Sequence, residues 1–146
     1  MQECKVRKKM KRVLFIICIT LFLTNANAIS PDFIKKMSYE TEYEKALSKA
    51  KKENKNIMMV VSQQSCPWCR KMEKQTLEKK PIDKLIKKSF IPLLVDKDSN
   101  SFPKKFEAKL FPTTIFIDAK NETEITKVLG YKDKIEFKAI LEEVTK

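Results

Sequence analysis

The sequence has very little glycine, no histidine and no long apolar run. One glycine in 146 residues leaves nothing from which to build a flexible linker, and no segment repeats, so a second module is not expected. The apolar run from Val13 to Leu23 is about half the roughly 20 residues that a membrane-spanning helix requires. The composition therefore predicts one domain with one hydrophobic core.

The first 28 residues have the three-part pattern of a secretory signal. The apolar run follows a basic segment and ends near Ala26-Asn27-Ala28, a small-x-small cleavage site. The basic residues are Lys5, Arg7, Lys8, Lys9, Lys11 and Arg12. We expect cleavage after Ala28 and a periplasmic or secreted mature domain of residues 29–146. The alternative is an uncleaved segment that anchors the protein to the membrane.

Removal of this segment changes the charge and the cysteine content of the chain. Cys4 and Cys18 leave with it, and only Cys66 and Cys69 remain. Six of the 31 basic and one of the 19 acidic residues also leave, so 25 basic and 18 acidic residues give a net charge of +7. Lysines mixed with glutamates along amphipathic segments are typical of a solvated surface, and we expect no nucleic-acid partner.

The pattern of apolar residues predicts helices that alternate with short strands. Thr41 and Glu44 fit a capping box before an amphipathic helix that reaches about Asn54. Further helices are predicted over residues 67–79, around 82–86, over a short stretch marked by Phe102, Phe106 and Leu110, and after Asp133 and Glu136. Strands are predicted over residues 56–62, 90–95, 113–118 and 123–129, with Pro92 indicating an edge strand. This order predicts an α/β fold, a mixed four-stranded sheet with helices on both faces.

Cys66-Pro67-Trp68-Cys69 stands where the first core strand passes into a helix. Pro67 suits the first helical position, and two thiols at this spacing can close a disulfide without backbone movement. Cys66 faces the positive end of the helix dipole, which favours its thiolate, the species that attacks disulfides. A loop this short constrains the unfolded chain very little, so a purely stabilising role is not expected. The mature chain lacks the further cysteines and histidines that zinc needs, and we expect no cofactor and no metal.

Three landmarks in order resemble the thioredoxin family over roughly residues 38–145. They are the Cys66–Cys69 motif, Phe111-Pro112-Thr113 before the third strand, and Leu129-Gly130-Tyr131 after the fourth. The match is closest to exported thioredoxin-like thiol–disulfide oxidoreductases. The resemblance implies that Cys66 is the nucleophile and Cys69 the resolving thiol of a redox-active disulfide. It also implies a cis-proline at Pro112.

The resemblance further implies a substrate surface and supporting residues. We expect Trp68, Phe111, Pro112 and Thr113 to contact substrate, with Pro67 and Gly130 in support. Gly130 would adopt a positive φ, leave room beside the site, or do both. The family's acid six residues before the first cysteine is here Val60, so Glu73 or Lys71 would have to substitute for it.

The direction of electron flow follows from the length of one connection. Strong periplasmic oxidants of this fold insert a helical domain between the second and third core strands, and residues 96–111 leave room for only one short helix and a loop. We therefore expect a monomer that reduces protein disulfides and draws electrons from a membrane-embedded thiol donor. The alternatives are a copper-handling dithiol module, a disulfide isomerase or an oxidase.

Overall fold

The computed structural model describes residues 29–146 of the chain. The predicted signal or anchor segment, residues 1–28, lies outside this described part. Within residues 29–146, no helix combines the length and the apolar character needed to cross a membrane.

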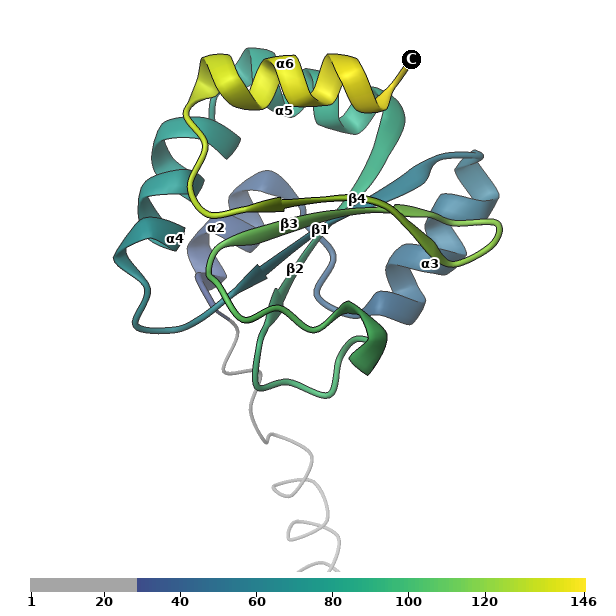
Figure 1. The fold of residues 1–146 in the computed structure, drawn as a ribbon, viewed down its shortest axis with the longest axis horizontal. Coiled ribbons are helices and arrows are strands. Elements are labelled where there is room, and N and C mark those ends of the chain that lie inside the picture. The colour runs from purple at the N-terminus through teal and green to yellow at the C-terminus, as the bar shows by residue number, and fades with distance from the viewer. Residues whose placement is uncertain (1–28) are drawn as a thin grey trace, which may run out of the picture.

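Four strands form one mixed sheet in the order β2-β1-β3-β4 (Figure 1). Their bounds are β1 Asn56–Ser62, β2 Phe90–Asp96, β3 Thr113–Asp118 and β4 Thr123–Leu129. β1 pairs in parallel with β2, and β3 pairs antiparallel with both β1 and β4. The predicted α/β thioredoxin fold with a mixed four-stranded sheet is confirmed.

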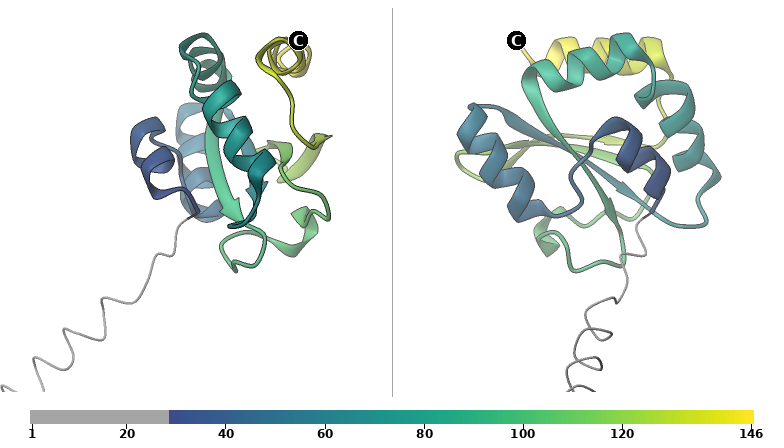
Figure 2. Two further views of the ribbon diagram at one scale, coloured as in Figure 1. Left: turned by 90° about the vertical axis from the view of Figure 1, so that its left-hand side faces the viewer. Right: turned by 180° about the vertical axis from the view of Figure 1, so that it is seen from behind.

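The buried residues form two hydrophobic cores because side chains alternate between the faces of each strand. Met58 and Val60 of β1 belong to one core, which also contains residues of α2 (Pro31–Met37), α5 (Lys80–Ser89) and α6 (Lys134–Val144). Met59 and Val61 belong to the other core, under α3 (Tyr43–Glu53) and Phe106. α5 and α6 lie side by side over the first face (Figures 1 and 2). Helices on both faces were predicted, and the structure confirms them.

β2 is an edge strand, as Pro92 predicted. Proline has no N–H to donate to a neighbouring strand, which confines it to sheet edges or bulges. The outer side of β2 is partly covered by Glu40, whose N–H donates to the Pro92 carbonyl at 2.9 Å and whose carbonyl accepts from the Leu94 N–H at 2.9 Å. This single bridge shortens the open edge of the sheet.

The segment after the motif is divided into three helical pieces. α4 (Pro67–Met72) has Pro67 in its first turn and continues into a π-helical stretch, η2 (Glu73–Leu77). Pro81 then lies in the first turn of α5, where a proline needs no N–H partner. At the other end of the chain, the predicted cap of α6 is confirmed as a full capping box between Asp133 and Glu136.

Two predicted details of the helices are wrong or incomplete, and one helix was not predicted. Thr41 and Glu44 form no capping box: the N-cap of α3 is Glu42 without a side-chain cap, because the first N–H of the helix, that of Tyr43, donates to the Ser101 carbonyl at 2.8 Å. The expected helix over residues 102–110 is only the 3₁₀ turn η3 (Lys104–Phe106), which ends in extended backbone at Glu107. The helix α2 was not predicted at all.

Candidate active site

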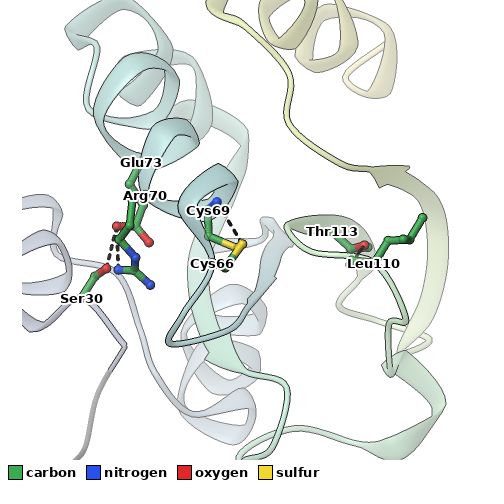
Figure 3. The surroundings of a disulfide bond; sticks show 7 residues. All are labelled: Ser30, Cys66, Cys69, Arg70, Glu73, Leu110 and Thr113. Atoms are coloured by element: carbon green, nitrogen blue, oxygen red, sulfur yellow. Dashed lines mark hydrogen bonds and ion pairs between the residues drawn. A yellow bond between two sulfur atoms is a disulfide. The ribbon is translucent and has the colours of Figure 1, made fainter.

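Cys66 and Cys69 form a disulfide at the start of α4 (Figure 3). Cys66 has extended backbone as the N-cap residue, and the N–H of Cys69 donates to its Sγ at 3.1 Å. This contact satisfies one of the N–H groups that every helix start leaves without a partner inside the helix. Cys66 is 8% exposed and Cys69 is 2% exposed, the order expected from their positions. Approach from solvent is therefore more open at Cys66.

Residues 97–112 connect β2 to β3, and the end of this connection lies beside the disulfide. Hydrogen bonds hold it in place. The Phe111–Pro112 peptide bond is cis. The Pro112 carbonyl accepts from the Gly130 N–H at 2.8 Å, and the Thr113 hydroxyl donates to the Leu110 carbonyl at 2.7 Å. In Figure 3 the disulfide lies between Thr113 and Leu110 on one side and Ser30, Arg70 and Glu73 on the other.

The predicted substrate-contact residues differ in their exposure. Trp68 is 55% exposed, as expected for a surface ring beside the cysteines. Thr113 is fully buried, so its side chain forms no part of the exposed surface and instead holds the Leu110 carbonyl. Phe111 is half-buried and packs against the core under α3. Pro112 is buried, whereas Pro67 is exposed.

Gly130 adopts a φ of +75°, in the region that favours glycine. A Cβ added at this position would meet no atom within 4 Å. The conformational reason for the glycine is therefore confirmed. The other expectation, that its missing side chain leaves room beside the site, stays a prediction.

A buried carboxylate, Glu73, lies on the Ser30 side of α4. It is 4% exposed and its Oε2 accepts from the Ser30 hydroxyl at 2.6 Å and from Arg70 at 3.0 Å. Burial raises the pKa of the Glu73 carboxyl above its ordinary value, while the Ser30 hydrogen bond and the Arg70 charge oppose that rise. Val60, at the position of the family's usual acid, is buried in the core.

Sequence reasoning did not anticipate an aromatic and cationic cluster next to Cys66. The Nζ of Lys71 lies 4.8 Å from the centroid of the Trp68 ring and 4.7 Å from that of Tyr131. The two ring centroids are 5.7 Å apart, and the Tyr131 hydroxyl donates to Gln75 at 3.4 Å. Trp68 and Lys71 are three residues apart, so a helix brings them to one face. Tyr131 belongs to the Leu129-Gly130-Tyr131 landmark, but its contact with Trp68 and Lys71 was not predicted.

The reactive atoms at this site are the sulfur atoms of Cys66 and Cys69. Among residues 29–146, no group of three or more histidine, cysteine, aspartate or glutamate side chains is arranged to hold a metal ion. A vicinal dithiol at a helix start can exchange electrons with another disulfide by two successive sulfur–sulfur displacements. The fold and this pair define a thioredoxin-like domain with a disulfide-bonded Cys-x-x-Cys pair at a helix start.

Comparison with known proteins places the chain in a family. The sequence profile of the thioredoxin-like domain matches residues 43–145, and the chain belongs to this family. Mouse spermatogenesis-associated protein 20 is 38% identical over 55 residues, 38% of this chain and 7% of that protein. The chain therefore spans less than a tenth of the length of this relative.

Solved structures share the fold at low sequence identity. A thioredoxin from Thermus thermophilus superposes with a TM-score of 0.64 at 22% identity, over 73% of this chain and 86% of that one. A structure described as DsbH oxidoreductase superposes with a TM-score of 0.59 at 18% identity, over 83% of this chain and 92% of that one. These likenesses support the fold.

Proposed function

We propose that the protein is an exported oxidoreductase that reduces disulfides in other proteins. The observation that carries the proposal is the position of the Cys66–Cys69 pair, at the N-cap of α4 and next to the cis-proline connection. Cys66 is the more exposed sulfur and lies at the positive end of the helix. It is therefore the attacking group, and Cys69, one turn further in, is the resolving group.

The reaction conserves electrons and protons through two displacements. In the reduced protein, the Cys66 thiolate attacks one sulfur of a substrate disulfide, and the other substrate sulfur leaves as a thiolate that takes a proton from water. Cys69 then loses its proton to water and attacks the Cys66 sulfur. This second step releases the reduced substrate and leaves the Cys66–Cys69 disulfide. A dithiol donor, which we propose is embedded in the membrane, returns the two electrons.

The reducing direction is supported by the short connection between β2 and β3. Between Asp96 and Thr113 the chain forms one three-residue turn, η3, and irregular backbone. No helical domain is present in this part of the chain, and so the broad substrate surface of the strong oxidants has no counterpart there. Export is supported by the basic, apolar and small-residue pattern of residues 1–28.

The test is the equilibrium potential of the Cys66–Cys69 couple against glutathione, together with its redox state in cells. We expect a potential closer to the thioredoxin value of about −270 mV than to the strong-oxidant value of about −120 mV. In cells that export the protein, thiol labelling should find it mainly reduced. The Cys66→Ser variant, which cannot form the disulfide, is the reference for the labelling. A potential near about −120 mV with a mainly oxidised pool would contradict the reducing direction.

A further inference from the structure

The helix α5 presents a row of exposed lysines, each one helical turn from the next. Lys80, Lys84 and Lys88 follow one another at intervals of four residues, so they share one side of the helix and span about 12 Å along its axis. We call these three lysines the α5 stripe. Ile82 and Ile86, on the other side of the helix, are buried in the core. The view from behind in Figure 2 shows α5 at the outside of the domain, in front of α6.

No carboxylate of the described domain neutralises the α5 stripe. Within residues 29–146, none of the ion pairs includes Lys80, Lys84 or Lys88. The one acidic residue of α5, Asp83, pairs with Lys87 instead. The charge of the stripe therefore faces solvent and is available to another molecule.

The α5 stripe works against the stability of its own helix. Like charges four residues apart on a helix repel each other, and the stripe contains two such pairs in succession. Lys80 is also in the first turn, where the positive end of the helix dipole favours acidic residues. The N-cap residue Lys79 accepts no side-chain cap hydrogen bond that would offset this. A surface that lowers local stability in this way is typical of one kept for binding.

The composition of this surface fits a lipid bilayer better than a protein partner. The large hydrophobic side chains that are exposed within residues 29–146 all lie outside α5. Protein interfaces have an apolar centre and are depleted in lysine. A cluster of lysines attracts anionic headgroups without any apolar contact. The net charge of +7 over residues 29–146 adds attraction at longer range.

We propose that the α5 stripe adsorbs the domain to a bilayer that contains anionic phospholipids, with α5 lying along the headgroups. The ammonium groups of the stripe pair with lipid phosphates, and neither cysteine takes part. The inference therefore goes beyond disulfide reduction and does not depend on it. Adsorption concentrates the protein at the membrane, where we propose that its dithiol donor is embedded.

Two double variants that remove equal charge test the stripe. Lys80→Gln with Lys84→Gln removes two of its three charges. Lys45→Gln with Lys49→Gln on α3 is the matched control, because these lysines are also exposed and one turn apart, but each is paired with a glutamate. α3 covers the opposite face of the sheet from α5. The control lysines are therefore farther from a bilayer at α5 than the Debye length of roughly 10 Å in about 0.1 M salt.

The measurement is sedimentation of the purified exported proteins with phosphatidylcholine vesicles that contain or lack phosphatidylglycerol. The wild type should sediment with the anionic vesicles at low salt and be released at high salt. Each lysine near an anionic bilayer contributes about 1 kcal/mol, or about fivefold in the partition coefficient, so the α5 variant should lose about 25-fold. The α3 variant should lose less than about fivefold, because its lysines lie beyond the screening distance. All three proteins should reduce dithiodipyridine, a small neutral disulfide, at similar rates.

Three results would overturn adsorption by the α5 stripe. The first is no sedimentation of the wild type with anionic vesicles at low salt. The second is an equal loss for the two double variants, because net charge alone would then explain the binding. The third is binding of the wild type to soluble polyglutamate but not to vesicles, which would make the partner an acidic polypeptide. None of these results bears on disulfide reduction, since the dithiodipyridine assay measures that function separately.

Discussion

The Ser30 hydroxyl donates a 2.6 Å hydrogen bond to Oε2 of Glu73, a residue 43 positions further along the chain. This bond joins the start of α2 to the helix that carries the cysteines (Figure 3). Arg70 donates to the same oxygen at 3.0 Å. Because both donors act on one oxygen of a buried carboxyl, its ionisation state is coupled to the packing of α2 on the domain.

The pKa of Glu73 makes stability depend on pH in a defined direction. Burial raises its folded-state pKa above the ordinary value of 4.5, so the folded protein binds this proton more tightly than the unfolded chain. This contribution to stability is fully present below pH 4.5 and is lost as the pH rises through the folded pKa. Glu73→Gln, which keeps an acceptor oxygen and cannot ionise, should therefore gain stability relative to the wild type as the pH rises.

Urea denaturation at several pH values between about 4 and 8 measures this difference. Glu142→Gln is the control, because Glu142 is an exposed carboxylate whose partner is Lys138. A stability difference between Glu73→Gln and the wild type that does not change with pH would contradict the raised pKa.

The two cysteines should give opposite results when each is replaced by serine. Cys66→Ser should abolish disulfide reduction. Cys69→Ser should accumulate mixed disulfides with substrate proteins, because Cys66 still attacks and nothing resolves the product. Non-reducing electrophoresis of both variants measures the trapped species. Trapping by Cys66→Ser and not by Cys69→Ser would reverse the assigned roles.

Exported protein should begin at Ile29. The prediction comes from Ala26-Asn27-Ala28 at the end of the apolar run, and N-terminal sequencing of the exported fraction tests it. A full-length chain in the membrane fraction would support the anchor alternative instead.

Phe106 should be the residue that fixes the 97–112 connection to the domain. It is fully buried in the core under α3, with its ring centroid 5.7 Å from that of Tyr43. Phe106→Ala should lower the free energy of unfolding by about 3–5 kcal/mol through lost burial and a cavity. Leu110→Ala, on the same connection and exposed, should change it by no more than about 0.5 kcal/mol. Similar losses for both variants would contradict this account.

Gly130→Ala should destabilise the domain through the backbone alone. With φ at +75° and no atom within 4 Å of the point that an alanine Cβ would occupy, the cost is that of a left-handed alanine, about 1–2 kcal/mol. Gly130→Asn should cost less, because asparagine tolerates this region better. Equal, larger losses for both variants in urea denaturation would show that packing dominates at this position.

The amino-acid sequence by itself determined the strands, the redox pair and the end of the chain. The observed β1, β3 and β4 coincide with the strands predicted over residues 56–62, 113–118 and 123–129. The prediction succeeded because each is a short run of apolar or β-branched residues between polar turns, a pattern that favours a strand. The spacing of Cys66 and Cys69, and the pair Asp133 and Glu136 before α6, are likewise local signals. In each of these two pairs the residues are three positions apart in the sequence.

Only the tertiary structure decided the features that join distant segments. The Ser101 carbonyl takes the N–H of Tyr43 and so replaces the cap predicted at Thr41. Ser30 reaches Glu73, and Tyr131 reaches Trp68 and Lys71, across more than 40 residues of sequence. No local pattern specifies such contacts, since they exist only once the fold has brought together segments that are distant in the sequence. The strands and cysteines follow from neighbouring residues, whereas the surface around the cysteines depends on the folding of the whole domain.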